Sequence, residues 1–274
     1  MSGAHPLRVG IAGIGAVGGS VLKALQTMPQ FKVAGVVGET VPVAMETLDR
    51  LGESHHLAME IGELAECSDV VVEAAPADAF LSIARPALAR ARTLVVLSAA
   101  GLLDVYDSVT ALLAQQQQGR LILASGAIGG LDVVKAAASG AINACRLVTI
   151  KPAAALASAP WVTDHGIDLA NLDGRLLVFS GTAREASQAF PANANVAATL
   201  ALAGPGPERV AVEIWADPVL DRNVHEIRID GDFGEMSVIV RGRPEPGNPR
   251  TSRLAAASVL AVLRDLTSHI RFGT

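Results

Sequence analysis

The chain has 274 residues, of which 50% are apolar and only 3% aromatic, and its formal net charge is −5. This length suits one large or two modest domains, with a core built mainly from Ala, Val, Leu and Ile. The acidic balance argues against nucleic acid or an anionic membrane as a partner, because neither would meet a large basic surface.

The two cysteines, Cys67 and Cys145, lie far apart and outside any metal-ligand spacing. This usage is typical of a reducing compartment. The N-terminal residues contain no apolar signal core, and no apolar run reaches the ~18 residues of a membrane-spanning helix. We therefore expect a cytoplasmic protein.

A short apolar run, Leu7 to Ala12, leads into Gly13, Gly15 and Gly18 and then into apolar residues at helical spacing. A strand, a G-x-G-x-x-G turn and a helix in this order are typical of a dinucleotide site. The first glycine allows the tight turn, the second lets the backbone approach a pyrophosphate, and the third lets the helix pack on the strand. The alternative is a glycine-rich turn that binds nothing. We expect a nicotinamide dinucleotide to contact Gly13, Ile14, Gly15, Ala16, Val17 and Gly18.

The second expected strand, Phe31 to Val37, is followed by Glu39. An acidic residue near this position can bind the ribose 2′-hydroxyl and disfavour a 2′-phosphate. No arginine lies beside Glu39, so the sequence favours NAD and leaves NADP open.

The remainder of the first half alternates helices with strands, which predicts a parallel, doubly wound Rossmann-type sheet. The expected strands are Asp69–Ala74, Thr93–Leu97 and Leu121–Ala124, and the expected helices are Val43–Leu51, Ile61–Glu66, Ala77–Arg90 and Leu103–Gln118. Ligands bind at the carboxyl ends of such strands. This edge would hold Gly13–Gly18, Ala75–Pro76, Ser98–Gly101 and Ser125–Gly130, and we add Ala75 to the expected cofactor contacts.

The strict alternation ends after Ser125, which indicates a second, α+β domain with a mostly antiparallel sheet. Its expected strands are Arg146–Ile150, Arg175–Ser180, Arg209–Ala216, Val224–Asp230 and Phe233–Val240, with a helix over Ala192–Ala203. Short turns between the last three strands favour antiparallel neighbours. A final helix is expected with Asn248 as its N-cap and Pro249 as its first residue.

These elements give a dinucleotide-binding domain over residues 1–125 and a substrate domain over residues 126–246. Residues 247–274 are expected to form a helix that packs back on the first domain. The antiparallel sheet of the second domain would serve as the interface of a homodimer.

Several segments together resemble the L-aspartate dehydrogenase family. They are Ser125–Asp132, Lys151–Pro152, Phe179–Gly204, Ala216–Pro218, Asn223–Ile227, Gly231–Gly234 and Asn248–Ser252. The resemblance implies NAD(P)-dependent oxidation of L-aspartate to iminosuccinate, which hydrolyses to oxaloacetate and ammonia, or the reverse reductive amination, with a possible supply of iminosuccinate to NAD biosynthesis. It also implies a catalytic role for His225 and contacts of Ala127 and Asn193 with the nicotinamide cofactor.

The residues themselves support part of this assignment. Strand alternation puts His225 on the apolar face with Ile227 and Ile229, either as a core histidine or at the rim of a crevice. A histidine there could exchange a proton near neutral pH, which deamination requires. Lys151 is a candidate cation for a substrate carboxylate, or else a solvated lysine at a strand end. Asn193 is equally explained by helix capping.

No His, Cys or carboxylate cluster shows metal-ligand spacing in the sequence, and His55, His56 and His269 are expected at the surface. Two other functions stay open at this point. One is a nicotinamide-dependent dehydrogenase for another amino or keto acid, and the other is a cofactor-binding regulator without catalysis.

Overall fold

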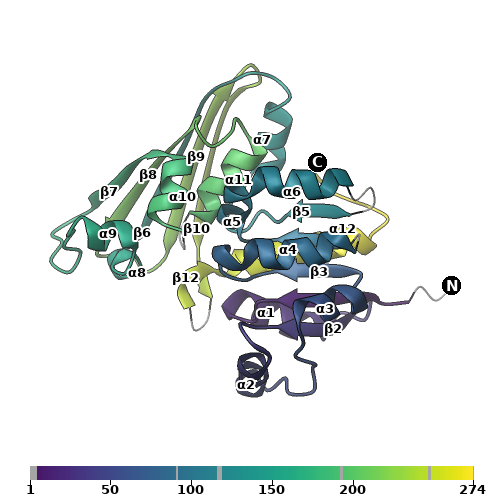
Figure 1. Ribbon diagram of the computed structural model, residues 1–274. Coiled ribbons are helices and arrows are strands. Elements are labelled where there is room, and N and C mark those ends of the chain that lie inside the picture. The colour runs from purple at the N-terminus through teal and green to yellow at the C-terminus, as the bar shows by residue number, and fades with distance from the viewer. Residues whose placement is uncertain (1–4, 91, 116–118, 192–193, 246–247, 274) are drawn as a thin grey trace. The chain divides into compact units, whose positions relative to one another are not determined.

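The computed structural model describes residues 5–90, 92–115, 119–191, 194–245 and 248–273 (Figure 1). The chain divides into two compact units. The N-terminal unit comprises Met1–Ala124 and Ala255–Arg271, and the C-terminal unit comprises Ser125–Leu254 and Phe272–Thr274.

The N-terminal unit contains a five-stranded sheet in the order β2-β1-β3-β4-β5, and every neighbouring pair is parallel. Its strands are β1 (Leu7–Ala12), β2 (Phe31–Val37), β3 (Val70–Glu73), β4 (Thr93–Val96) and β5 (Arg120–Leu123). The strand order reverses between β1 and β3, and at such a switch point the carboxyl ends of the strands open a crevice for a ligand. The predicted Rossmann-type fold is confirmed.

Helices cover both faces of this sheet because its strands are apolar on both sides. One core joins the sheet to α1 (Ala16–Leu25), α2 (Val41–Leu51) and α12 (Arg253–Thr267). The remaining helices are α3 (Ile61–Cys67), η1 (Ala77–Ala79), α4 (Phe80–Ala89), α5 (Ala99–Asp104) and α6 (Tyr106–Gln115). The helix expected over Leu103–Gln118 is therefore broken at Val105, and its last three residues lie outside the described part of the chain.

The C-terminal unit contains a second five-stranded sheet in the order β10-β9-β6-β8-β7. Its strands are β6 (Ile142–Pro152), β7 (Leu176–Thr182), β8 (Val210–Asp217), β9 (Asn223–Gly231) and β10 (Gly234–Gly242). All pairs are antiparallel except β6 with β8. The mostly antiparallel character is confirmed, but the prediction that β8 neighbours β9 is wrong. The long apolar strand β6 lies between them, since the centre of the sheet buries most surface.

One face of the second sheet carries the helices of this unit and one continuous core. The helices are α7 (Leu131–Ala137), α8 (Ala153–Leu156), α9 (Pro160–Asp164), α10 (Ala183–Ala189) and α11 (Asn195–Ala203). Helix α10 begins with a capping box, because Thr182 Oγ1 accepts from Glu185 N–H and the Glu185 carboxylate accepts from Thr182 N–H. The opposite face has no helix among the described residues.

The expected start of the last helix at Asn248 and Pro249 is wrong. Residues Asn248–Ser252 form strand β12, which pairs with β11 (Pro244–Glu245), and the helix starts at Arg253. Ser252 Oγ accepts a hydrogen bond from Leu254 N–H at 3.2 Å and so replaces Asn248 as the polar residue at the helix start. Pairing with β11 explains why a sequence that could begin a helix remains extended.

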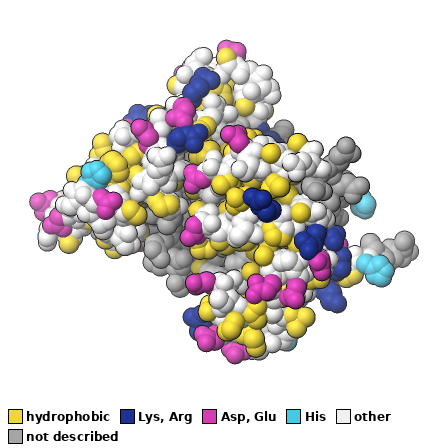
Figure 2. Space-filling view, in the orientation of Figure 1, with side chains coloured by type: hydrophobic (Ala, Val, Ile, Leu, Met, Phe, Trp, Pro, Cys, Tyr) yellow, Lys and Arg dark blue, Asp and Glu magenta, His cyan; other side chains and the backbone are white. Residues whose placement is uncertain are grey.

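No helix in the described ranges is both long enough and apolar enough to cross a membrane. On the face of the molecule drawn in Figure 2, acidic and basic side chains are interspersed among apolar ones.

Candidate active site

The glycine turn after β1 has the conformation that only glycines allow. Gly13 has φ = 92°, and a Cβ there would lie 2.6 Å from the backbone of Ala74 and Ala75. A Cβ at Gly18 would lie 1.9 Å from the carbonyl oxygen of Gly13. These contacts bring the turn against the end of β3 and α1 against the turn, so both glycines are required for the fold itself.

Gly15 differs from Gly13 and Gly18, because a Cβ placed there would meet no atom within 4 Å. It is exposed and is the N-cap residue of α1, and no side chain there caps the helix. The first turn of α1, with half-buried Ala16 and Val17, therefore presents its N–H groups and its partial positive charge to open space. Ile14 is buried in the core, so only its main chain can face a ligand. This cradle fits a pyrophosphate.

Replacing Gly15 by valine is expected to weaken NAD(H) binding by at least about 10-fold, since the new side chain would occupy the space that the phosphates need. Its melting temperature should stay within about 2 °C of the wild type, because no neighbouring atom has to move. Isothermal titration of the cofactor and differential scanning calorimetry measure the two effects. Gly18→Val is the contrasting variant, and it should lose thermal stability. Unchanged cofactor affinity in Gly15→Val would contradict this interpretation of the turn.

Buried Glu73 holds the neighbouring loops in place. Its carboxylate accepts hydrogen bonds from the N–H groups of Ala75 at 3.0 Å, Leu97 at 3.2 Å and Ser98 at 3.0 Å. Burial raises the pKa of Glu73, and these hydrogen bonds oppose that rise. Because Ala75 and Ser98 follow β3 and β4 at the carboxyl edge of the sheet, one side chain fixes two loops of the predicted cofactor crevice. Sequence reasoning treated Glu73 only as part of a strand.

The end of β2 also lies beside the glycine turn, since Gly13 N–H donates to the Val37 carbonyl at 2.8 Å. Glu39 follows two residues later and is exposed. Thr40 caps α2 by accepting from Val43 N–H at 3.4 Å, which fixes the backbone after Glu39. The proposed contact of Glu39 with a ribose is compatible with this position.

In the C-terminal unit, His225 and Lys151 lie on the helix-covered face of the sheet. His225 on β9 is paired with Thr149 on β6, and Lys151 follows Thr149 by two residues on the same face. Both side chains are almost completely buried, with an exposed fraction of 3% each. Thr149 Oγ1 lies 3.1 Å from His225 Nδ1, within hydrogen-bond distance. A buried ammonium group therefore lies close to a buried imidazole held by a hydroxyl group.

This environment changes the protonation of His225. Burial, followed by the positive charge of Lys151, lowers the pKa of His225 to about 3. The side chain is therefore neutral at pH 7, whereas the sequence alone suggested titration near neutrality. A neutral imidazole can accept a proton from a bound ligand, and a negative ligand on Lys151 would raise the pKa of His225 by offsetting the lysine charge.

The lowered pKa makes a prediction about stability. An unfolded chain protonates His225 near pH 6.5, while the folded protein does not until about pH 3, so the stabilisation is fully present above pH 6.5 and is lost as the pH falls toward 3. Over this range the wild type should lose about 1.4 kcal/mol per pH unit more than His225→Gln. Urea denaturation between pH 7 and pH 4 measures the difference, with exposed His269→Gln as the control. Parallel curves for wild type and His225→Gln would contradict a neutral buried His225.

The loop that contains Ala127 lies over the same region of the sheet. A Cβ at Gly129 would lie 3.1 Å from Val238 Cγ1 and 3.3 Å from Val240 Cγ2, and Val240 is the β10 partner of His225. Ala127 itself is half-buried against the core. Asn193, the other residue assigned to the cofactor by resemblance, lies outside the described residues.

Two polar residues near Lys151 were missed as site candidates from the sequence. Thr149 could have been found by strand alternation, since it shares a face with Lys151. Asp217 pairs with Pro152 across β6 and β8, and its buried carboxylate accepts from Arg175 Nε at 3.1 Å and from Val219 N–H at 3.0 Å. Arg175 is distant in sequence, so only the fold brings it to Asp217.

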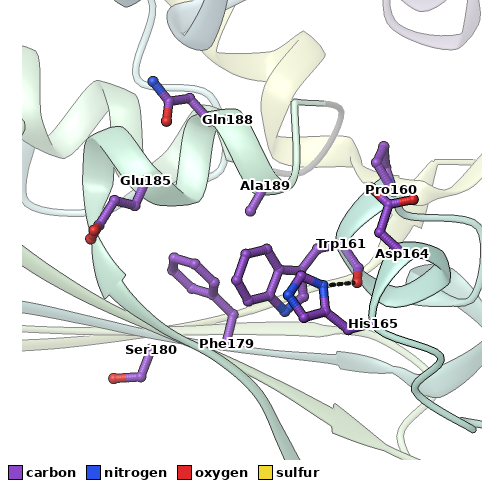
Figure 3. Close-up of a pocket in the computed structure, with 9 residues that line it drawn as sticks. All are labelled: Pro160, Trp161, Asp164, His165, Phe179, Ser180, Glu185, Gln188 and Ala189. Carbon is purple, nitrogen blue, oxygen red and sulfur yellow. Dashed lines mark hydrogen bonds between the residues drawn. The ribbon is translucent and has the colours of Figure 1, made fainter.

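A separate pocket lies between α9, α10 and the edge strand β7, with a volume of about 450 Å³ (Figure 3). The indole of Trp161 stacks on His165 with ring centroids 3.8 Å apart and meets Phe179 edge-on at 5.3 Å. Trp161 Nε1 donates to the Val178 carbonyl at 3.1 Å. His165 is the C-cap residue of α9, and its ring is held against the indole. Neither Lys151 nor His225 lines this pocket, so we do not assign the chemistry to it.

The sequence shows no metal-ligand spacing, but one loop of the N-terminal unit brings three side chains of metal-ligating types together. Glu53, His55 and His56 bring one ligand atom each to within 4.8 Å of one another. The His56 side chain is only 13% exposed, so it is not the surface histidine that we expected, whereas His55 is exposed at 65%.

A glycine cradle at the switch point of a parallel sheet, together with a second unit that buries an imidazole beside an ammonium group, defines a two-domain nicotinamide-dependent oxidoreductase. The family models agree with this class. Residues 13–124 match the model described as homoserine dehydrogenase, NAD binding domain, and residues 132–266 match the model described as aspartate dehydrogenase, C-terminal.

Relatives with similarity over the full chain specify the family. The chain is 40% identical to an L-aspartate dehydrogenase of Bradyrhizobium diazoefficiens over 98% of this chain and 94% of the relative. It is 37% identical to an L-aspartate dehydrogenase of Methanosarcina mazei, over 98% of this chain and 100% of the relative. The crystal structure of an aspartate dehydrogenase from Thermotoga maritima superposes with a TM-score of 0.73 at 27% identity, covering 98% of this chain and 100% of that one. The chain belongs to the L-aspartate dehydrogenase family, as the sequence resemblance indicated.

Proposed function

We propose that this enzyme oxidises L-aspartate at its α-carbon to iminosuccinate, which hydrolyses to oxaloacetate and ammonia, and that it also catalyses the reverse reductive amination. Family membership supports the substrate. The observation that carries the proposal is the buried pair of Lys151 and His225 on one face of the second sheet. A dicarboxylic amino acid needs a cation for a carboxylate and a neutral base for its ammonium group, and this pair supplies both.

Lys151 is the proposed carboxylate ligand. Its ammonium group is buried, so an ionic hydrogen bond to a carboxylate would be little weakened by water. Binding of a substrate carboxylate would offset the lysine charge and raise the proton affinity of His225. The substrate itself would thus prepare the base.

His225 is the proposed proton acceptor. We assign its Nδ1–H as the donor to Thr149 Oγ1, which leaves the lone pair of Nε2 free to take a proton from the substrate ammonium group. After releasing this proton to solvent, the same nitrogen would accept a proton from the water that attacks the imine. In the reverse direction, the protonated imidazole would return its proton to nitrogen.

Bound NAD or NADP supplies the hydride acceptor in the oxidative direction. The proposed cofactor contacts are Gly13, Ile14, Gly15, Ala16, Val17, Gly18, Ala75, Ala127 and Asn193. Exposed Glu39, two residues beyond β2, supports a preference for NAD through the ribose 2′-hydroxyl. In the cell, the proposed product iminosuccinate would feed NAD biosynthesis in the cytoplasm.

A spectrophotometric assay tests the proposal by following the reduced nicotinamide. The purified protein should reduce NAD or NADP with L-aspartate, and should oxidise the reduced cofactor with oxaloacetate and ammonia. Cofactor binding without turnover of either pair would refute the aspartate assignment. A panel of other amino and keto acids would then separate a different dehydrogenase from a non-catalytic regulator.

We also propose that the helix-free face of the second sheet forms a homodimer interface. It exposes Leu177 at 42% and Ile239 at 48%, and it also carries an Arg146–Glu213 ion pair. Apolar residues next to paired charges suit a self-complementary contact. Light scattering should give twice the chain mass of 28.1 kDa, and a monomer would refute this interface.

A further inference from the structure

The loop after α2 in the N-terminal unit begins in a rigid conformation. Gly52 has φ = 74° and donates its N–H to the Asp49 carbonyl at 3.1 Å, while Glu53 N–H donates to the Leu48 carbonyl at 2.8 Å. This pair of bonds is the Schellman motif, which ends a helix and fixes the two residues that follow it. The backbone of Glu53 is therefore held by the helix end.

The rest of the loop is held equally well. His56 N–H donates to the Glu53 carbonyl at 3.0 Å, which closes a turn and returns the chain toward Glu53. Beyond the turn, Val36 of β2 donates to the Leu57 carbonyl at 2.8 Å and accepts from Met59 N–H at 3.0 Å. The two histidines thus project from a segment that is anchored to a helix on one side and to a strand on the other.

Three donor atoms converge in this loop. Glu53 Oε2 lies 3.6 Å from His56 Nε2 and 3.9 Å from His55 Nδ1. Neighbouring ligands of a tetrahedral zinc ion with bonds of 2.0–2.1 Å are separated by about 3.3–3.4 Å. The two distances to Glu53 exceed this separation by a few tenths of an ångström, and all three donor atoms lie within 4.8 Å of one another, so side-chain adjustment would complete three corners of a tetrahedron.

The burial of two of these donors favours binding of a cation. Glu53 is 6% exposed, and its carboxylate accepts a hydrogen bond from the side-chain amide of Gln26. His56 Nε2 is buried and makes no hydrogen bond within the described part of the chain. A buried carboxylate facing a buried imidazole nitrogen is costly without a cation, whereas exposed His55 leaves an entry path and room for a water ligand.

We propose that Glu53, His55 and His56 form a binding site for a divalent transition-metal ion of the zinc class, with water as the fourth ligand. Two imidazoles and one carboxylate favour Zn²⁺ or Co²⁺ over Mg²⁺ and Ca²⁺, which prefer oxygen ligands. Gln26 is a positioning residue that orients the carboxylate. It caps the C-terminal end of α1, so the ion would join the ends of α1 and α2 to the segment that pairs with β2. The proposed role is structural.

Titration of the untagged, full-length protein with Co²⁺ tests the site. The expected result is one ion per chain with the intense visible absorption of tetrahedral cobalt, displaced by Zn²⁺ but not by Mg²⁺. His55→Ala should lose at least about 100-fold in Zn²⁺ affinity, and Gln26→Ala about 10- to 100-fold. Zn²⁺ should also raise the melting temperature of the wild type, because it binds the folded chain.

The control is His269→Ala, which removes an exposed histidine far from this loop in sequence and should bind Zn²⁺ as the wild type does. His55 is exposed, so His55→Ala should fold and report binding directly. Zn²⁺ affinity unchanged in both His55→Ala and Glu53→Gln, or a cobalt spectrum without tetrahedral bands, would overturn the proposal. None of these measurements depends on the aspartate assignment.

Discussion

Replacing His225 by asparagine is expected to lower kcat for L-aspartate by about 10²- to 10⁴-fold, which is the usual contribution of a positioned base. Asparagine has a similar size and is polar, so it should preserve packing on β9, but it cannot take up a proton at neutral pH. Cofactor affinity should change little. Steady-state kinetics with saturating NAD(P) and isothermal titration of NAD(H) separate the two effects.

Thr149→Val is the matched control for the position of the ring. It removes the hydroxyl 3.1 Å from Nδ1 but leaves the imidazole in place, so its loss of kcat should be smaller than that of His225→Asn. The valine variant should also change the pH profile, because the ring would lose the group that fixes its tautomer. A His225→Asn enzyme with more than a tenth of wild-type kcat would exclude His225 as the base.

Replacing Lys151 by methionine should raise the KM for L-aspartate by about 10- to 100-fold, since one ionic hydrogen bond to a carboxylate is lost. Methionine fills much of the lysine volume without its charge. A thermal melting curve checks that the variant is folded before its kinetics are compared. Its KM for the cofactor is the internal reference.

The same variant tests the electrostatic coupling to His225. Because the Lys151 charge lowers the pKa of His225, its removal should raise that pKa and move the acidic limb of kcat/KM to higher pH. A raised KM without any shift of the acidic limb would mean that Lys151 binds substrate but does not control the base. An unchanged KM would exclude it as the carboxylate ligand.

The sequence predicted the first unit well because its signals are local. The glycine spacing, the apolar strands and the intervening helices are each contained in one short segment, and the parallel sheet follows from their alternation. Gly13 and Gly18 show the reason directly, since each is required by a backbone contact that no other residue could tolerate.

The arrangement of the second unit was harder to predict from the sequence, because it depends on contacts between distant segments. Strand β6 pairs with β8 in parallel and so lies between β8 and β9. The short connection from β8 to β9 gives no sign of this intervening strand. Likewise, alternation identified the face of His225, but its low pKa needs the burial and the lysine charge that only folding brings together. The sequence did not indicate the cluster of Glu53, His55 and His56. These side chains come together only because the backbone turns between Glu53 and His56.

The N-terminal unit is discontinuous in the chain, and this affects how the protein is made. Its core includes Ala256, Val259 and Leu263 of α12, which pack with residues of β1 and β3 such as Ile11 and Val72. These residues of α12 leave the ribosome only after Ser125–Leu254 of the C-terminal unit has been synthesised. The core of the dinucleotide-binding unit is therefore completed only after most of the C-terminal unit has been translated. Until α12 has been translated, the apolar surface of the sheet that it covers stays exposed. Exposed apolar surface of this kind makes nascent chains prone to aggregate.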